Sequence, residues 1–166
     1  MSELDRVADQ WEQLERVPPG SLVQARETLH WAAQIPGAAG NSLVPPRPDD
    51  GHTTLCWDDA LRGLATDPEP GFRVALLPEL MALQLLLAEG GPVSRLELDG
   101  RTLDDALTWL ARAIEEHTGE PPAGPIARRD YDLPAHPVAT GAPFAAVDPD
   151  QRRQLTRWFA NGARLL

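Results

Sequence analysis

Apolar residues in the N-terminal part of the chain recur at helical spacing. This pattern predicts a first helix within residues 1–20, which the run Pro18-Pro19-Gly20 ends. A second helix is expected over residues 21–35, because Pro36-Gly37 follows it. Residues 37–51 are rich in Gly, Pro, Asn and Asp, so we expect them to be irregular.

The spacing then changes to an alternation of polar and apolar residues, which is typical of strands. Thr53, Leu55 and Trp57 alternate with Thr54 and Cys56. Further strand-like runs, separated by turn residues, cover residues 61–66, 72–77, 80–88 and 93–98. The run 80–88 is also compatible with a short buried helix, and its flanking turn signals favour a strand. We therefore expect an antiparallel meander of four or five strands.

Two more helices are predicted after the sheet. The first begins after Thr102, which forms a capping pattern with Asp105, and ends at Gly119. The second begins after Asp148, and a Pro-rich connector, residues 120–147, joins the two. Strands flanked by helices predict one α+β domain over residues 1–166, with two N-terminal and two C-terminal helices packed on the sheet.

Composition and charge restrict the classes of function. The chain has 166 residues, of which 42% are hydrophobic and 24% charged, as in a globular protein of about one domain. Its net charge of −10 argues against nucleic acid and anionic membranes as partners. The longest apolar run is shorter than the roughly 20 residues that cross a bilayer. With no signal peptide and a single cysteine, we expect a cytoplasmic protein.

A polar stripe on the second predicted helix is the first candidate site. Arg26, His30 and Gln34 lie four residues apart, beside an apolar line on the same helix. At the edge of a core, Arg26 can hold an anion while His30 transfers a proton. The alternative is structural: the three side chains form hydrogen bonds with the loop that follows the helix.

A run of ionisable residues in the connector is the second candidate site. It contains Arg129, Asp130, Tyr131 and His136, and prolines on both sides stiffen the backbone around His136. These residues are candidates for binding a ligand. The alternative is that they anchor a long loop through Arg–carboxylate pairs and a tyrosine hydrogen bond.

Motifs for metal, cofactor or nucleophilic chemistry are missing from the sequence. No His or Cys spacing matches a common metal site, so we expect no metal, although a site assembled from separate segments stays an alternative. No motif requires a cofactor, and no Walker loop or G-x-S-x-G elbow occurs. We expect Cys56 to be a small core residue in a strand.

Two further features concern packing. The first predicted helix is acidic, and Arg153, Arg157 and Arg164 lie on one face of the last helix. Pairing between these helices, within the chain or across a dimer, is a hypothesis; two ordinary solvated faces are the alternative. Trp31 falls opposite the apolar line of its helix, so it is either exposed or covered by another segment.

Three segments together resemble a group of uncharacterised bacterial proteins. The segments are residues 25–30 with Ala33-Gln34, residues 52–55 with Trp57, and residues 136–138 with Gly141-Ala142. The resemblance covers roughly residues 22–166. It implies the order helix, antiparallel meander, helix, and it implies no activity, substrate or cofactor.

Three classes of function remain open after these observations. The first choice is a non-enzymatic binding or assembly protein with a protein partner or with a second copy of itself, including a homodimer. The second is a binder of a small molecule or anion that uses the two candidate sites. The third is a hydrolase that uses a metal or a His–Asp pair. A cavity of at least about 300 Å³ beside Arg26, His30 and Gln34 would favour the second or third class.

Overall fold

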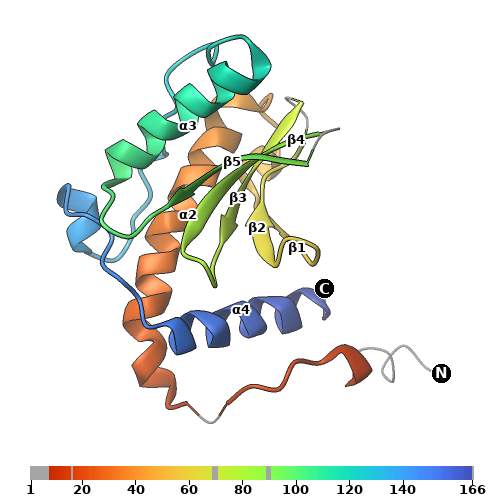
Figure 1. Ribbon diagram of the computed structural model, residues 1–166, viewed down its shortest axis with the longest axis vertical. Helices are drawn as coiled ribbons and strands as arrows, with labels where there is room; N and C mark the ends of the chain where they lie inside the picture. Colours follow the sequence, from red (N-terminus) through yellow and green to blue (C-terminus); the bar gives the residue numbers. More distant parts are fainter. Residues whose placement is uncertain (1–7, 16, 69–70, 89–90, 166) are drawn as a thin grey trace.

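The computed structural model of the protein describes residues 8–15, 17–68, 71–88 and 91–165. The elements follow one another in the order helix, sheet, helices (Figure 1). Their bounds are η1 Pro19–Leu22, α2 Val23–Leu43, η2 Gly51–Thr53, β1 Cys56–Asp58, β2 Gly63–Ala65, β3 Phe72–Leu77, β4 Ala82–Leu87, β5 Gly91–Glu97, α3 Leu103–Thr118, η3 Pro137–Thr140 and α4 Pro149–Ala163. The fold is therefore α+β, as the sequence predicts.

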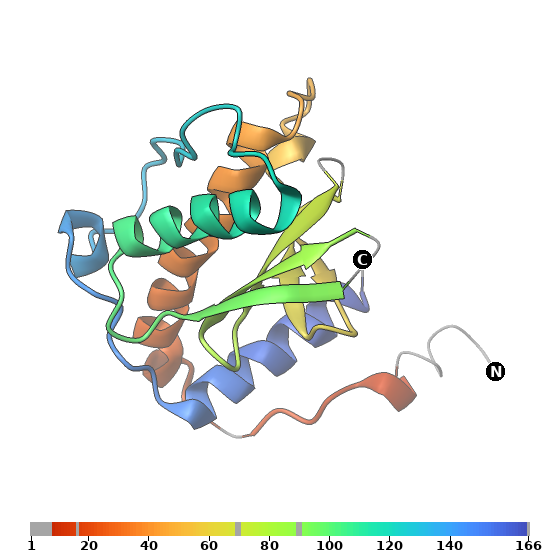
Figure 2. The same cartoon turned by 45° about the horizontal axis from the view of Figure 1, so that its top comes forward.

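The five strands form one antiparallel meander sheet in the order β1-β2-β3-β4-β5. Figures 1 and 2 show α2 and α3 packed against one face of the sheet, while α4 runs across its lower end. The main core lies between that face and the helices, and includes Leu29, Ile35, Leu76, Leu83 and Leu110. A smaller apolar cluster around Ala75 and Leu86 forms separately from this core.

Local signals place most of the later elements correctly. The runs 72–77 and 80–88 become β3 and β4, which confirms that the ambiguous second run is a strand. Thr102 and Asp105 form the expected capping box at the start of α3, and Gly119 ends that helix in the left-handed region with φ 80°. Short-range chemistry is sufficient in this part of the chain.

The predicted first helix is wrong over most of its described length. Residues 8–10 are helical, whereas residues 11–15 and 17, which we call the N-terminal strap, have no regular secondary structure. The rest of the predicted helix lies outside the described residues. The side chain of Asn161 in α4 replaces the helical hydrogen bonds of Glu12, because its Oδ1 accepts from the Glu12 N–H and its Nδ2 donates to the Glu12 carbonyl, both at 2.9 Å.

Helix α2 is longer than the sequence suggests, because it continues through Pro36 to Leu43. The predicted end at Pro36-Gly37, and the irregular structure expected from residue 37 to residue 43, are therefore wrong. Its C-terminal half is held by close packing against η2: a Cβ atom on Gly40 would lie 2.5 Å from the carbonyl oxygen of His52. Tertiary packing here outweighs the hydrogen bond that a proline removes inside a helix.

Candidate functional site

The predicted stripe on α2 faces away from the connector. Arg26 and His30 are exposed, and Gln34 is half-buried with its Nε2 donating to the carbonyl of His30 at 3.3 Å. Arg26 and His30 have no side-chain hydrogen bond or ion pair with a described residue. The stripe therefore contributes two polar groups that the described fold leaves without partners.

The first part of the connector is tied to α2 and to the loop before η2. The guanidinium of Arg129 donates to Asn41 Oδ1 at 2.7 Å and to Asp50 Oδ1 at 2.9 Å. The hydrogen bond from Arg129 lowers the pKa of the Asp50 carboxyl below its ordinary value. Asp130 and Tyr131 lie on the surface next to this anchor.

His136, near the end of the connector, packs against the opposite side of α2, where it contacts Thr28 and Trp31. Its Nδ1 accepts the N–H of Val138 at 3.3 Å, which leaves the hydrogen of a neutral ring on Nε2, 3.5 Å from Thr28 Oγ1. The ring stacks on Trp31 at 6.4 Å between centroids, and the Arg128 guanidinium lies 5.2 Å from the Trp31 ring. Trp31, 4% exposed, is therefore buried by the connector.

The two predicted groups of site residues do not form one site. No described hydrogen bond or ion pair joins Arg26, His30 or Gln34 to the connector residues. The connector instead contacts Thr28, Trp31 and Asn41, which lie on other faces of α2. Any site around Arg26 must therefore be built with another part of the chain.

The surroundings of Arg26 are formed by α4 together with the N-terminal strap. A cavity of about 330 Å³ lies among the strap, α2 and α4, and its walls are Glu15, Val17, Pro19, Leu22, Arg26, Gln154, Leu155, Trp158 and Phe159. A second cavity, of about 270 Å³, reaches the sheet and is lined by Arg26, Leu29, His30, Ala33, Leu64, Leu76 and Phe159. Because both include Arg26 and Phe159, they adjoin. We call the two together the α2–α4 groove.

The walls of the α2–α4 groove are mostly apolar, with few polar groups. Phe159, which belongs to both cavities, stacks on Trp57 of β1 at 6.4 Å between ring centroids. Gln154 is 1% exposed, and neither Nε2 nor Oε1 of its amide has a hydrogen bond partner among the described residues. A buried amide without a protein partner costs free energy, so the Gln154 amide is a polar group in the groove wall that can still form hydrogen bonds.

The strap that forms one wall is held by ion pairs. Glu12 makes a two-pronged pair with Arg62 at 2.7 and 2.8 Å, and Arg164 approaches it at 3.5 Å. The hydrogen bond from Arg62 is the main cause that lowers the pKa of Glu12. Arg157 pairs with Glu15 at 3.3 Å. The hypothesis of pairing between the acidic N-terminal segment and the last helix thus holds within the chain for Arg157 and Arg164.

The sequence pattern does not identify several residues of the α2–α4 groove as site residues. Leu155, Trp158 and Phe159 carry an apolar signal that predicts core, yet Trp158 is 56% exposed at the rim of the groove. Gln154 carries no signal at all. Cys56, expected in the core, is exposed on the edge strand β1.

All four histidines lie in the part of the chain that the structure describes. Within the ranges that the structure describes, no group of three or more His, Cys, Asp or Glu side chains is placed to hold a metal ion. The ring nitrogens of His52, His117 and His136 meet backbone groups or Thr28, and the described residues include no hydrogen bond between a histidine and a carboxylate. None of the described helices combines the length and the apolar character that crossing a membrane requires.

Comparisons with known proteins add no family. No protein-family model, no curated protein and no solved structure matches this chain. The resemblance to uncharacterised bacterial proteins stays a prediction.

Proposed function

We propose that this chain is a non-enzymatic binding protein whose α2–α4 groove takes an amphipathic small molecule with an apolar body and a carboxylate. One observation carries the proposal: the guanidinium of Arg26, which pairs with no residue that the structure describes, belongs to both adjoining apolar cavities. Mostly apolar pockets with a few polar groups that orient the ligand are typical of small-molecule sites.

The size of the groove fits this class of ligand. Its two cavities, of about 330 and 270 Å³, meet at Arg26 and Phe159. An alkyl chain or an aromatic body that enters either cavity gains free energy from burial, at roughly 25 cal/mol per Å² of apolar surface. The apolar walls therefore supply affinity, and the polar groups decide which end of the ligand lies at the mouth.

The charges at the mouth favour a carboxylate. A guanidinium binds a carboxylate through two parallel hydrogen bonds, and Arg26 has no competing partner among the described residues. Among the described residues that line the groove, Glu15 is the only acidic one, and Arg157 already pairs with it. His30 follows Arg26 by one helical turn and offers a second donor to the same head group.

Titration calorimetry with decanoate tests the proposal, with decanol as the probe that lacks the carboxylate. Decanoate should bind, decanol should bind at least about tenfold more weakly, and Arg26→Gln should remove this preference. Arg112→Gln is the matched control, because Arg112 is an exposed arginine on α3 outside the groove. Equal binding of decanoate by wild type and Arg26→Gln, or no binding at all, would contradict the proposal.

A second candidate is self-association through the same face. Trp158 is 56% exposed at the groove rim, and Val23, in the first turn of α2, is 41% exposed. Exposed tryptophans are frequent anchors of protein interfaces. Native mass spectrometry of wild type and Trp158→Ser distinguishes the two: a dimer that the substitution abolishes favours assembly, and a monomer in both leaves the groove to a small molecule.

A further inference from the structure

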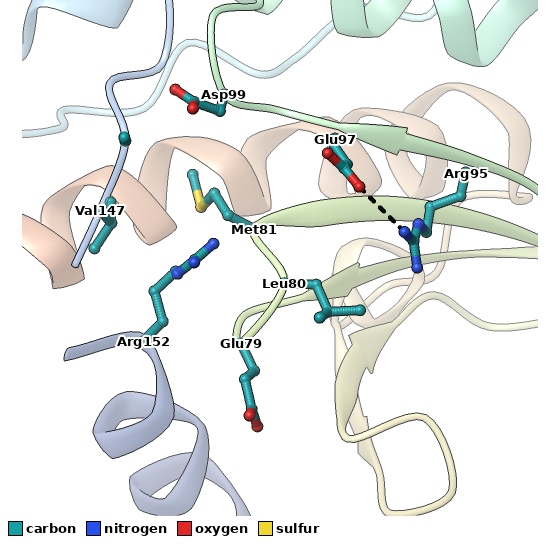
Figure 3. A pocket seen from close by; sticks show the side chains of 9 residues that line it. Glu79, Leu80, Met81, Arg95, Glu97, Asp99, Val147 and Arg152 are labelled. Atoms are coloured by element: carbon teal, nitrogen blue, oxygen red, sulfur yellow. Dashed lines mark hydrogen bonds and ion pairs between the residues drawn. The ribbon is translucent and has the colours of Figure 1, made fainter. Parts of the chain in front are cut away.

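A further cavity, at the N-terminal end of α4, has a different chemistry from the α2–α4 groove. It measures about 340 Å³ and lies where the turn between β3 and β4, the end of β5 and the start of α4 meet. Figure 3 shows it from close by. Its charged side chains are Glu79, Arg95, Glu97, Asp99 and Arg152, and the hydrophobic ones include Leu80, Met81 and Val147.

Of the two guanidinium groups that line this cavity, that of Arg152 has no ion pair with a described residue. Figure 3 shows its side chain pointing from α4 into the space below Asp99 and beside Met81. Its Nε is buried without a hydrogen bond partner, and the guanidinium makes no ion pair with a described residue. Arg95, by contrast, pairs with Glu97 at 3.1 Å. A partly buried guanidinium without a partner is a strong binder of a carboxylate.

The acidic side chains make a simple anion a poor ligand. Three carboxylates line the cavity against two guanidinium groups, and one of those guanidinium groups is already paired with Glu97. A lone anion would be repelled by the remaining carboxylates, whereas a lone cation would leave Arg152 without a partner. Neither Asp99 nor Glu79 has an ion pair with a described residue, but Figure 3 shows the Glu79 carboxylate pointing away from the Arg152 guanidinium. We therefore take Asp99 as the carboxylate that holds a positive group.

We propose that this cavity binds a free α-amino acid with an apolar side chain. The ligand carboxylate pairs with Arg152, and its ammonium group lies against Asp99. The side chain of the ligand packs on Met81 and Val147. This site is separate from the α2–α4 groove and does not depend on the function proposed for it.

Titration calorimetry with L-leucine tests the proposal, beside two probes that each lack one charge. N-acetyl-L-leucine has no ammonium group and isoamylamine has no carboxylate, so each should bind at least about tenfold more weakly than L-leucine. Arg152→Gln and Asp99→Asn should each weaken L-leucine binding at least about tenfold. Arg153→Gln is the matched control, because Arg153 is the next residue, pairs with Asp150 and lies outside the cavity.

A readout on the unaltered chain keeps the test decisive if a variant fails to fold. In two-dimensional ¹H–¹⁵N spectra of the wild type, L-leucine should shift the amide signals of residues 79–81, 95–99 and 146–152. No shift at millimolar L-leucine, shifts confined to other residues, or equal binding of N-acetyl-L-leucine would each overturn the proposal.

Discussion

Helix α2 has one side that the chain closes and one side that it leaves open. On the closed side, His136 and Arg128 cover Trp31. The His136 ring in turn lies within hydrogen-bonding distance of Thr28 and accepts the backbone N–H of Val138. On the open side, Arg26 and His30 meet an apolar groove and no described polar partner. Both sides carry arginine, histidine and aromatic residues, so composition does not distinguish them. The difference is that the polar groups on the closed side bond to other described residues, whereas the exposed Arg26 and His30 bond to no described residue and are free to contact a ligand in the groove.

The largest effect is expected when Trp31 is removed from the closed side of α2. Trp31→Ala deletes a side chain that is 4% exposed and supports both His136 and Arg128, so it should lower the free energy of unfolding by about 3–5 kcal/mol. Urea unfolding followed by circular dichroism measures the change. A loss below about 1 kcal/mol would mean that the connector does not close this side of α2 in solution.

Two buried amides on α4 allow the next comparison. Gln154 has no described partner, whereas Asn161, equally buried at 1% exposure, bonds both backbone groups of Glu12. Gln154→Met should raise the free energy of unfolding by about 1–2 kcal/mol, because it replaces an unpaired amide with an apolar group of similar shape. Asn161→Leu, the matched control, should lower the same quantity by about 1–3 kcal/mol. Loss of stability in Gln154→Met would show that water or another group satisfies the amide.

The strap over the open side should respond to pH through Glu12. The folded pKa of Glu12 lies below its ordinary value of 4.5, so the stabilisation from its Arg62 pair is complete above that value. It is lost as the pH falls through the lower, folded pKa. Glu12→Gln should therefore cost about 0.5–1 kcal/mol near pH 6 and less at a pH below 4.5, as measured by urea unfolding at both pH values. An equal cost at both would contradict the ion pair.

The sheet and the later helices follow from short-range signals, whereas the strap does not. Alternation in residues 72–77 and the capping pair Thr102–Asp105 act within a few residues, so the sequence is sufficient for β3 and α3. The strap has a helical pattern, but its conformation depends on Asn161 and Arg62, which lie far away in the chain. Partners at such separation cannot be deduced from one sequence.

The candidate site shows the same division. Four-residue spacing is enough to place Arg26 and His30 on one stripe of α2, and the structure puts both in the groove. The other wall comes from Phe159 and Trp158, whose apolar pattern is the same whether they fill the core or line a cavity. The unpaired amide of Gln154 is a property of the packed state, so no pattern of residues predicts it.

The smallest effect on stability is expected on the open side, at Arg26. Because its guanidinium has no described partner, Arg26→Gln should change the free energy of unfolding by less than about 0.5 kcal/mol in urea unfolding experiments. Arg129→Gln provides the contrast, because it breaks the bonds to Asn41 and Asp50 and should lower the free energy of unfolding more than Arg26→Gln does. If Arg26→Gln cost as much as Arg129→Gln, the open side would be held by contacts within the chain, and its arginine would not be free for a ligand.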